Sequence, residues 1–520
     1  MTQFSCPPTV DGQKEIGSHQ SAANIKDSRM FEHKSFLNAL KWAYTGILVD
    51  KGFSAVFFLI LAKLLGPEDF GIVSLAMIYV GFLQMFLDQG LATAIIQRKD
   101  LTHAHLNAVF CMDLGLSVGL VLISILFSRA WGSLNHSPEV AVVASVLSVS
   151  IIFEALTVVQ TAILRREMNF RSLSIRSNVS NSISAVVGIA LAWRGAGVWA
   201  LVCQVLLRDL IALILLWKLT TWRPSFTFSW THLKELMGFS INNFAAQLAI
   251  FADVQAGSIV LGIFFGPAAV GLYRIADKVM STVVTIAMNS IQAVSLPQFS
   301  RLQDSPVELK KSVITCIRTA SAATLPALAG LAAGSYQLMA VIGPKWIPAA
   351  GALKVLCFMG MGVIFAYFTS PLMQALGKPR QVAALEWTRT LVGCIALGAA
   401  GCLARASLVE TQVLSIAVAR LVTAAIFVIP FYVYFLLKLA NISPREFANS
   451  AVASIVAAAS VATAVGLLGA SEWLAGANPV ALLVVETAVG GFTGIGAVLL
   501  IDRQLRGFAA GLVDRLMRRN

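Results

Sequence analysis

The stretch FSAVFFLILAKLLGPEDFGIVSLAMIYVGFL, residues 53–83, places two apolar segments on either side of a Gly-Pro turn. A helix that crosses the hydrocarbon core of a bilayer needs about 20 mostly apolar residues. Apolar segments of this length recur along the chain, and we predict about 14 membrane spans. They lie near residues 40–64, 71–95, 107–127, 139–163, 179–193, 196–217, 239–264, 271–295, 313–342, 349–376, 381–403, 408–437, 448–470 and 479–501. The expected fold class is therefore all-α, in a polytopic integral membrane protein.

Lysine and arginine concentrate in alternate loops. One set of loops carries clusters such as Arg165, Arg166 and Arg171, whereas the intervening loops carry single basic residues such as Lys63 and Arg129. Both ends of the chain are basic as well. By the positive-inside rule the basic set faces the cytoplasm, so we expect two cytoplasmic termini and an even number of spans. The net charge of +13 lies largely in these loops, where it meets anionic lipid, and we predict no nucleic-acid partner.

The composition agrees with a membrane protein and excludes several other classes. Hydrophobic residues make up 57% of the chain and charged residues 12%, against roughly 45–50% and 25% in soluble domains. The seven cysteines are odd in number and lie mostly within apolar spans, which argues against a disulfide framework. No Cys/His cluster with metal-ligand spacing and no phosphate-binding glycine loop is present in the sequence. We therefore predict no metal, no cofactor and no enzymatic activity.

A short motif recurs in the two halves of the chain. LGPEDFG at residues 65–71 and FGPAAVG at residues 265–271 are both Gly-Pro-x-x-x-Gly turns between apolar spans, 200 residues apart. An even number of spans separates them, so they predict two six-helix bundles in the same orientation around a central cavity, with two additional helices. The expected parts are a flexible cytoplasmic extension (1–36), an N-terminal bundle (37–217), a cytoplasmic linker with an amphipathic helix (218–238), a C-terminal bundle (239–438), an extra helix pair (439–501) and a basic cytoplasmic tail (502–520).

Several strings resemble the polysaccharide transporter branch, the Wzx-type oligosaccharide flippases, of the multidrug/oligosaccharidyl-lipid/polysaccharide exporter superfamily. They are LGPEDFG (65–71), DQGLATAIIQR (88–98), RREMNFR (165–171), GLYRIADKVM (271–280), LPQFSRLQDSPVELKK (296–311) and ALGKPR (375–380). The resemblance implies a flippase in the bacterial inner membrane that moves undecaprenyl-diphosphate-linked oligosaccharide units across the bilayer by alternating access. The implied pathways export O-antigen, capsule or exopolysaccharide, with polymerase and chain-length or export proteins as further partners. The resemblance also implies a cationic lumen lined by spans one, two, seven and eight.

Ionisable residues within the predicted spans are the candidate substrate contacts, because charges at membrane depth face a wet cavity or one another. The cavity candidates are Arg274, Lys278, Arg420, Asp50, Lys51, Asp253, Asp277 and Asp88. Arg274 and Lys278 are four residues apart and share a helix face, which suits a diphosphate. The alternative is an Arg274–Asp277 pair within the helix, with Lys278 extending to the membrane interface.

The remaining candidates have their own alternatives. Asp50 and Asp253 lie near the middle of the first span of each half, where a carboxylate balances cavity cations or couples transport to protons. Arg420 has no carboxylate one turn away and needs a partner from another helix or a cavity. Glu386 and Arg389, three residues apart, are expected to form a structural ion pair.

Proline within the spans marks the expected hinge positions. Pro326 and Pro371 each remove a helix hydrogen bond and are the hinge candidates, with a static kink as the alternative. Two other functions stay open at this stage. A cation-coupled drug or metabolite antiporter of the same superfamily is favoured by a lumen dominated by carboxylates. A membrane polysaccharide polymerase or ligase requires a large translocated loop, and every such loop here is short.

Overall fold

The computed structural model describes residues 53–54, 56–87, 91–98, 100–225, 227–231, 233, 240–469, 478–502 and 506–507. These residues form helices joined by short connections, with no strand in the described part. Eleven of the described helical segments are long and apolar enough to cross a membrane. The helices at residues 67–84 and 170–193 are more polar, and the first predicted span lies mostly outside the described residues. The all-α polytopic prediction is confirmed, and about 14 spans is compatible with this count.

Most predicted spans correspond to one helix or to a broken pair of helices. The helical elements are α2 (Pro67–Gln84), α3 (Leu91–Gln97), α4 (His103–Leu134), α5 (Pro138–Leu147), α6 (Val149–Arg166), α7 (Phe170–Trp193), α8 (Val198–Leu219), α10 (Ser240–Phe265), α11 (Pro267–Arg301), α12 (Pro306–Ala333), α13 (Ser335–Ile342), η1 (Pro344–Ala349), α14 (Ala350–Val363), η2 (Ile364–Phe368), α15 (Thr369–Ala375), α16 (Pro379–Leu403), α17 (Val409–Thr423), η3 (Ala424–Val428), α18 (Ile429–Ala440), α19 (Pro444–Gly469) and α20 (Pro479–Ile501).

Some of these elements differ from the sequence prediction. The span predicted at 71–95 is two helices, α2 and α3, and α7 begins at Phe170 rather than near residue 179. The span predicted at 349–376 is interrupted by the 3₁₀ segment η2, and the one at 408–437 by the π-helical segment η3. Hydropathy counts apolar residues over a whole window, so it does not detect a local change in helical hydrogen bonding.

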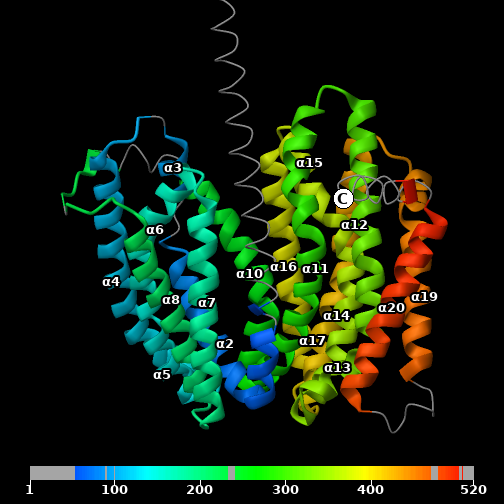
Figure 1. Ribbon diagram of the computed structural model, residues 1–520, viewed down its shortest axis with the longest axis horizontal. Coiled ribbons are helices and arrows are strands. Elements are labelled where there is room, and N and C mark those ends of the chain that lie inside the picture. Colours follow the sequence, from blue (N-terminus) through cyan, green and yellow to red (C-terminus); the bar gives the residue numbers. More distant parts are fainter. Residues whose placement is uncertain are drawn as a thin grey trace, which may run out of the picture.

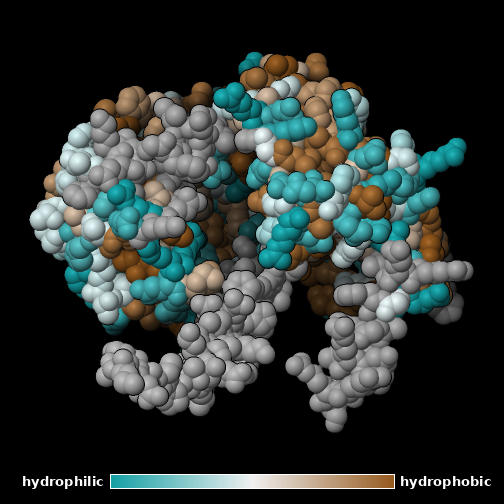
Figure 2. All heavy atoms as spheres, turned by 90° about the horizontal axis from the view of Figure 1, so that it is seen from above, coloured by the Kyte–Doolittle hydropathy of each residue, from teal (hydrophilic) through white to brown (hydrophobic). Residues whose placement is uncertain are grey.

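The helices form two lobes with a hollow between them. The N-lobe contains α2–α8 and the C-lobe contains α10–α18, with α19 and α20 packed beside α12 (Figure 1). The lobes stand apart at the end that carries the connections before α4, α7 and α12, which we call the basic end. Seen from that end, a hollow separates the two lobes (Figure 2).

The lobes meet at the opposite end, where the two Gly-Pro motifs pack against each other. Both motif prolines stand at the first position of their helices, α2 and α11. Proline is favoured there because its missing N–H has no partner to lose. Trp346 is fully buried beside this crossing, where it donates to the carbonyl of Ala62 at 2.6 Å and contacts the ring of Phe70 edge-on. A continuous apolar core thus joins the lobes at this end.

Candidate functional site

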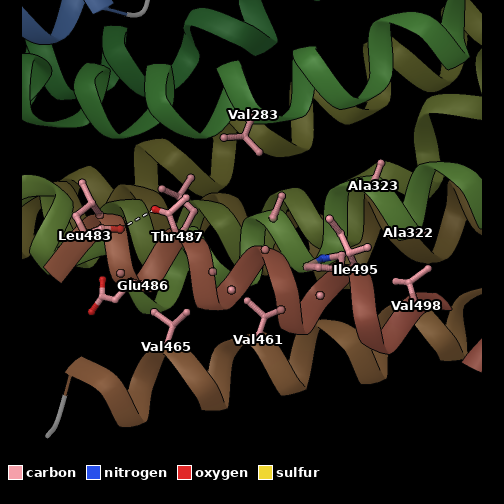
Figure 3. Close-up of a pocket in the computed structure, with 18 of the residues that line it drawn as sticks. Val283, Ala322, Ala323, Val461, Val465, Leu483, Glu486, Thr487, Ile495 and Val498 are labelled. Atoms are coloured by element: carbon pink, nitrogen blue, oxygen red, sulfur yellow. Dashed lines mark hydrogen bonds between the residues drawn. The ribbon is translucent and has the colours of Figure 1, made fainter. Parts of the chain in front are cut away.

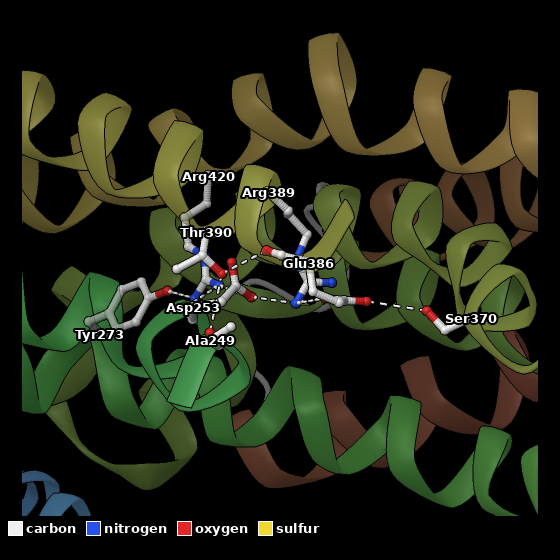
Figure 4. Close-up of polar contacts among 8 residues, drawn as sticks. All are labelled: Ala249, Asp253, Tyr273, Ser370, Glu386, Arg389, Thr390 and Arg420. Carbon is white, nitrogen blue, oxygen red and sulfur yellow. Dashed lines mark hydrogen bonds and ion pairs between the residues drawn. The ribbon is translucent and has the colours of Figure 1, made fainter. Parts of the chain in front are cut away.

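A carboxylate and two guanidinium groups meet on the C-lobe. Asp253 lies on α10, Arg389 on α16 and Arg420 on α17 (Figure 4). Nη2 of Arg389 lies 2.9 Å from Oδ2 of Asp253, and Nη2 of Arg420 lies 3.7 Å from the same oxygen. Arg420 also donates to the backbone carbonyl of Asp253 at 3.1 Å. One carboxylate therefore connects three helices that are far apart in the sequence.

Further polar groups extend this cluster in two directions. Arg389 pairs with Oε2 of Glu386 at 3.1 Å, and the other oxygen of Glu386 accepts from Ser370 of α15 at 3.2 Å. On the other side, Nη1 of Arg420 lies 3.1 Å from the hydroxyl of Tyr273, a fully buried residue of α11. We call Asp253, Tyr273, Glu386, Arg389 and Arg420 the C-lobe network.

The C-lobe network balances its own charge. Its ionised side chains are between 15% and 20% exposed, and two carboxylates face two guanidinium groups. Ions at this depth are stable only when they are paired and hydrogen-bonded. Asp253, Glu386, Arg389 and Arg420 line a cavity of about 540 Å³. The network itself is therefore formally neutral, while Asp277 on the same wall leaves the cavity lining with an excess of one negative charge.

The structure places the predicted cavity residues in different environments. Asp277 lines the same cavity as the network, together with Asp253 and Arg420. Arg274 instead donates to Gln255 of α10 at 3.3 Å, and Lys278 has an exposed side chain. The expected Glu386–Arg389 ion pair is confirmed, and it continues into Asp253. Asp50, Lys51 and Asp88 lie outside the described residues.

A second polar pocket lies on the N-lobe. It has a volume of about 550 Å³ and is lined by residues of α6, α7 and α8. Of these helices, α7 lies on the side of the N-lobe that faces the C-lobe (Figure 1). Five charged residues line it, and we call them the N-lobe cluster: Glu154, Arg165, Arg176, Arg208 and Asp209. Arg208 pairs with the neighbouring Asp209 at 2.8 Å. Three cations against two carboxylates leave this wall with a formal excess of positive charge.

The sequence prediction missed the N-lobe cluster as a site. The sequence predicts both Arg165 and Arg176 in a basic loop, because one span is expected to end near residue 163 and the next to begin near residue 179. In the structure Arg176 lies within α7, and Ser180 and Ser184 follow it at intervals of four residues. This spacing places all three on one helix face. These polar residues lower the hydropathy of the first turns of α7, so the sequence predicts a span that begins near residue 179 rather than at Phe170.

The hinge candidates lie in the C-lobe. Pro326 is buried within α12, and Pro371 stands near the start of α15, directly after the 3₁₀ segment η2. The sequence prediction missed Pro430, which stands at the start of α18 after the π segment η3. Thr369 donates to the carbonyl of Tyr432 at 3.0 Å, so the helices that follow the two irregular segments, α15 and α18, are connected to each other.

The two walls suit the binding of a polar, anionic molecule. Guanidinium groups bind phosphate oxygens through paired hydrogen bonds, while serine, threonine and asparagine bind hydroxyl groups. The N-lobe pocket offers Ser177, Ser180, Asn181 and Thr157 beside its arginines. Within the described ranges, no group of three His, Cys, Asp or Glu residues is arranged to hold a metal ion.

Known proteins with similar sequences serve polysaccharide biosynthesis. Residues 60–351 match the family described as "Polysaccharide biosynthesis protein". Succinoglycan biosynthesis transport protein ExoT of Rhizobium meliloti is 26% identical over 347 residues, which cover 65% of this chain and 69% of ExoT. Lipopolysaccharide biosynthesis protein WzxC of Escherichia coli is 22% identical over 333 residues, which cover 62% of this chain and 67% of WzxC.

Solved structures with the same fold are membrane transporters. Lipid II flippase MurJ in an inward closed conformation has a TM-score of 0.69 and 12% identity, and the match covers 90% of this chain and 99% of MurJ. An inward-facing multidrug resistance transporter of the MATE family has a TM-score of 0.57 and 18% identity, covering 74% of this chain and 94% of that one. At these identities the similarity shows a shared fold.

Proposed function

The chain belongs to the polysaccharide biosynthesis protein family, in the polysaccharide transporter branch of the multidrug/oligosaccharidyl-lipid/polysaccharide exporter superfamily, and we propose that it is a flippase for undecaprenyl-diphosphate-linked oligosaccharides. It is a multi-pass membrane protein. In this proposal it lies in the bacterial inner membrane, with its basic end and both termini in the cytoplasm. Its cargo then passes to the polymerase and export proteins of a surface polysaccharide pathway.

One observation carries the proposal: both lobes bear arginines within their helices, on the walls of polar pockets. The N-lobe contributes Arg176 and Arg208, with Arg165 at the basic end of α6, and the C-lobe contributes Arg389 and Arg420. Placing charges within spans is expensive, about 2.5–3.5 kcal/mol each at the centre of a helix on insertion scales. A lipid-linked diphosphate is an anion that has to cross the same depth. Fixed cations along its path replace the water that the diphosphate loses.

The neutral C-lobe network supplies cations without leaving them unpaired. In the empty cavity Asp253 and Glu386 hold Arg389, and Asp253 also holds Arg420. An entering diphosphate competes with these carboxylates for the same guanidinium donors. We infer that cargo binding loosens the contact between α10, α16 and α17. The sugar hydroxyls then face the Ser, Thr and Asn side chains of the N-lobe pocket.

The fold supplies a route for alternating access. The lobes are joined at the end opposite the basic end and separated at the basic end (Figure 1). A rocking motion about the α2–α11 crossing therefore closes one end as it opens the other. This is the usual way in which transporters with two similar halves expose one central site to each side in turn.

Vesicles containing the purified full-length protein test the proposal. The probe is an undecaprenyl-diphosphate-linked oligosaccharide with a fluorophore on the sugar, and a membrane-impermeant reductant destroys the dye in the outer leaflet. Protein-free vesicles lose only the outer-leaflet signal, whereas active protein exposes the inner-leaflet dye as well. Lys311→Ala, which changes an exposed surface ion pair, is the matched control and is expected to behave as wild type. Loss of only the outer-leaflet signal in vesicles that contain well-folded wild-type protein would refute the proposal.

A cation-coupled antiporter is the second candidate, and one observation favours it. Asp253, Asp277 and Glu386 all line the C-lobe cavity, and carboxylates suit a cationic drug. The same vesicles separate the two functions. Uptake of an organic cation against a proton or sodium gradient, without movement of the lipid-linked dye, identifies the antiporter.

A further inference from the structure

A separate cavity of about 580 Å³ lies between α12 and α20, with α19 behind it (Figure 3). Its volume is that of a ligand pocket rather than a packing defect. Small residues form much of the wall, and we call this space the C-terminal cavity. Gly494 packs closely on Val461 and Pro326, but Gly491 has no heavy atom within 4 Å of the position that a Cβ would occupy. Helix α20 therefore packs against α12 and α19 at Gly494 and leaves open space beside Gly491.

One carboxyl group is buried in the wall of this apolar cavity. Glu486 of α20 is 2% exposed, and neither of its side-chain oxygens has a hydrogen-bond partner among the described residues. Gln337 of α13 lies nearby, since its amide nitrogen and Oε1 of Glu486 both approach Gly469, and Oε1 of Gln337 also lacks a partner in the described part of the chain. Gly334 and Gly469 make room for the carboxyl group, since a Cβ on either would stand 3.1 and 3.3 Å from its oxygens.

The wall of the cavity thus contains a buried carboxyl group whose oxygens have no hydrogen-bond partner among the described residues. The lining around Glu486 is largely aliphatic. A carboxylate buried in such a lining is strongly unfavourable unless a hydrogen-bond donor or a positive partner reaches it. A ligand that satisfies this site needs an apolar body and a head with N–H donors and positive charge. A primary ammonium group has three such donors.

Glu486 lies near the end of α20 at which the headgroup of a bound lipid would stand. It lies seven residues after Pro479, at roughly 10 Å along the helix from that end. That end of α20 is opposite the basic end (Figure 1). Thr487, Gly491 and Ile495 line the cavity and are exposed, so the cavity is open along this face of α20. An acyl chain can enter along this side while its headgroup stays near the membrane surface.

We propose that the C-terminal cavity binds an amine-bearing phospholipid, such as phosphatidylethanolamine, with its ammonium group on Glu486 and one acyl chain along Gly491. This cavity is distinct from the C-lobe cavity, because α11 stands between them: Val283 lines the first, whereas Met280 and Val284 line the second. The cargo itself is a poor occupant of the Glu486 end, since its diphosphate would face an unpaired carboxylate. The inference therefore does not depend on the proposed transport function.

Native mass spectrometry of the purified full-length protein tests the site. The probes are phosphatidylethanolamine, phosphatidylcholine and phosphatidylglycerol with identical acyl chains. We expect wild type to bind phosphatidylethanolamine about tenfold more tightly than phosphatidylglycerol, a typical effect of one charge-assisted contact. Phosphatidylcholine, whose ammonium group has no N–H, should fall between them. Glu486→Gln should reduce phosphatidylethanolamine binding to the phosphatidylglycerol level.

Two glycine variants on the same helix provide a matched pair. Gly491→Leu fills the cavity and should abolish tight binding of all three lipids. Gly496→Leu, whose Cβ also meets no atom within 4 Å but which does not line the cavity, should bind lipid as wild type does. Equal binding of the three lipids by wild type would overturn the proposal, as would unchanged binding by folded Glu486→Gln. Displacement of phosphatidylethanolamine by an equal concentration of undecaprenyl phosphate would assign the cavity to the polyprenyl chain instead.

Discussion

Gly71 of α2 lies directly against the backbone carbonyl of Pro267 of α11, so closely that a Cβ on the glycine would overlap the carbonyl group. The contact is reciprocal, because Gly271 of α11 meets the carbonyl of Pro67 of α2 in the same way. Each Gly-Pro-x-x-x-Gly motif thus supplies the proline that the other motif's glycine contacts. Only glycine permits this approach of two backbones. The repeat that identified two halves in the sequence is also the place where those halves meet.

The first prediction concerns this crossing. Gly71→Ala forces α2 and α11 apart, and we expect the free energy of unfolding to fall by about 1–3 kcal/mol, as in other overpacked contacts. Thermal unfolding of the purified protein in detergent measures the change. Gly119→Ala on α4 is the control, because a Cβ there meets nothing within 4 Å. Gly271→Ala should behave like Gly71→Ala, and the double variant should fall short of the sum, since both changes act on one contact. Wild-type stability of Gly71→Ala would contradict the packing.

The second prediction concerns the coupling within the C-lobe network. Arg389→Ala leaves Asp253 near Arg420 but removes the cation beside Glu386. We therefore expect Arg389→Ala to destabilise the protein and Glu386→Gln to restore part of the loss in the double variant. A double-mutant cycle should give a coupling of about 0.5–3 kcal/mol. For comparison, Lys311 and Glu308 form an exposed pair, which should couple by less than about 1 kcal/mol. Strict additivity at Glu386 and Arg389 would show that their contact is not energetically coupled.

Sequence reasoning predicted the long-range architecture because hydropathy and loop charge report directly on burial in a bilayer. It predicted the order of the spans and the confirmed all-α class, and it required a partner from another helix or a cavity for Arg420. It did not identify that partner as Asp253, 167 residues away, because a single sequence carries no distance between helices. The Glu386–Arg389 pair was predicted because three-residue spacing is a local signal.

The misses have physical causes as well. Arg176 was assigned to a loop because the polar face of α7 lowers its hydropathy, although its four-residue polar spacing was readable. The 3₁₀ and π segments η2 and η3 contain only apolar and aromatic residues, so nothing in their composition distinguishes them from regular helix. Their geometry depends on packing between helices, which the sequence alone does not specify.

The third prediction concerns the N-lobe cluster. If the arginines of this pocket contact the cargo, Arg176→Ala should reduce polymer export at least tenfold, while Arg176→Lys should keep part of it because the charge remains. Arg194→Ala is the control, since Arg194 is exposed on the loop at the other end of α7. Export is measured by complementation of a flippase-deficient strain, with expression measured in parallel. Normal export by well-expressed Arg176→Ala would exclude this residue from cargo binding.

The fourth prediction separates a hinge from a static kink. Pro326 lies within α12 and Pro371 follows η2, so both prolines stand in helical segments of the C-lobe. If either is a hinge, replacement by alanine restores a helix hydrogen bond, stiffens the segment and slows dye movement in vesicles without lowering the unfolding temperature. Pro306→Ala, at the exposed start of α12, should leave both quantities unchanged. A lower unfolding temperature together with an unchanged rate of dye movement would identify a static kink.

The last prediction concerns the cations of α11. Arg274 and Lys278 are one turn apart, and we predict that they contact the lipid diphosphate, with Arg420 as a weaker third contact. Arg274→Ala and Lys278→Ala should each abolish polymer export in the complemented strain, whereas Arg274→Lys and Lys278→Arg should retain part of it. The reason is that binding of a diphosphate depends first on the positive charge of the side chain and then on its hydrogen-bond geometry.

The structure adds a way to distinguish cargo contact from helix packing at Arg274. Arg274 donates to Gln255 of α10, so its loss could act by loosening α10 from α11. Gln255→Ala removes the same hydrogen bond but keeps the cation. If Arg274 acts on the cargo, Gln255→Ala should export nearly normally while Arg274→Ala fails. Equal defects in the two variants would assign Arg274 to packing, and normal export by a well-expressed Arg274→Ala/Lys278→Ala double variant would transfer the diphosphate contact to Arg389 and Arg420.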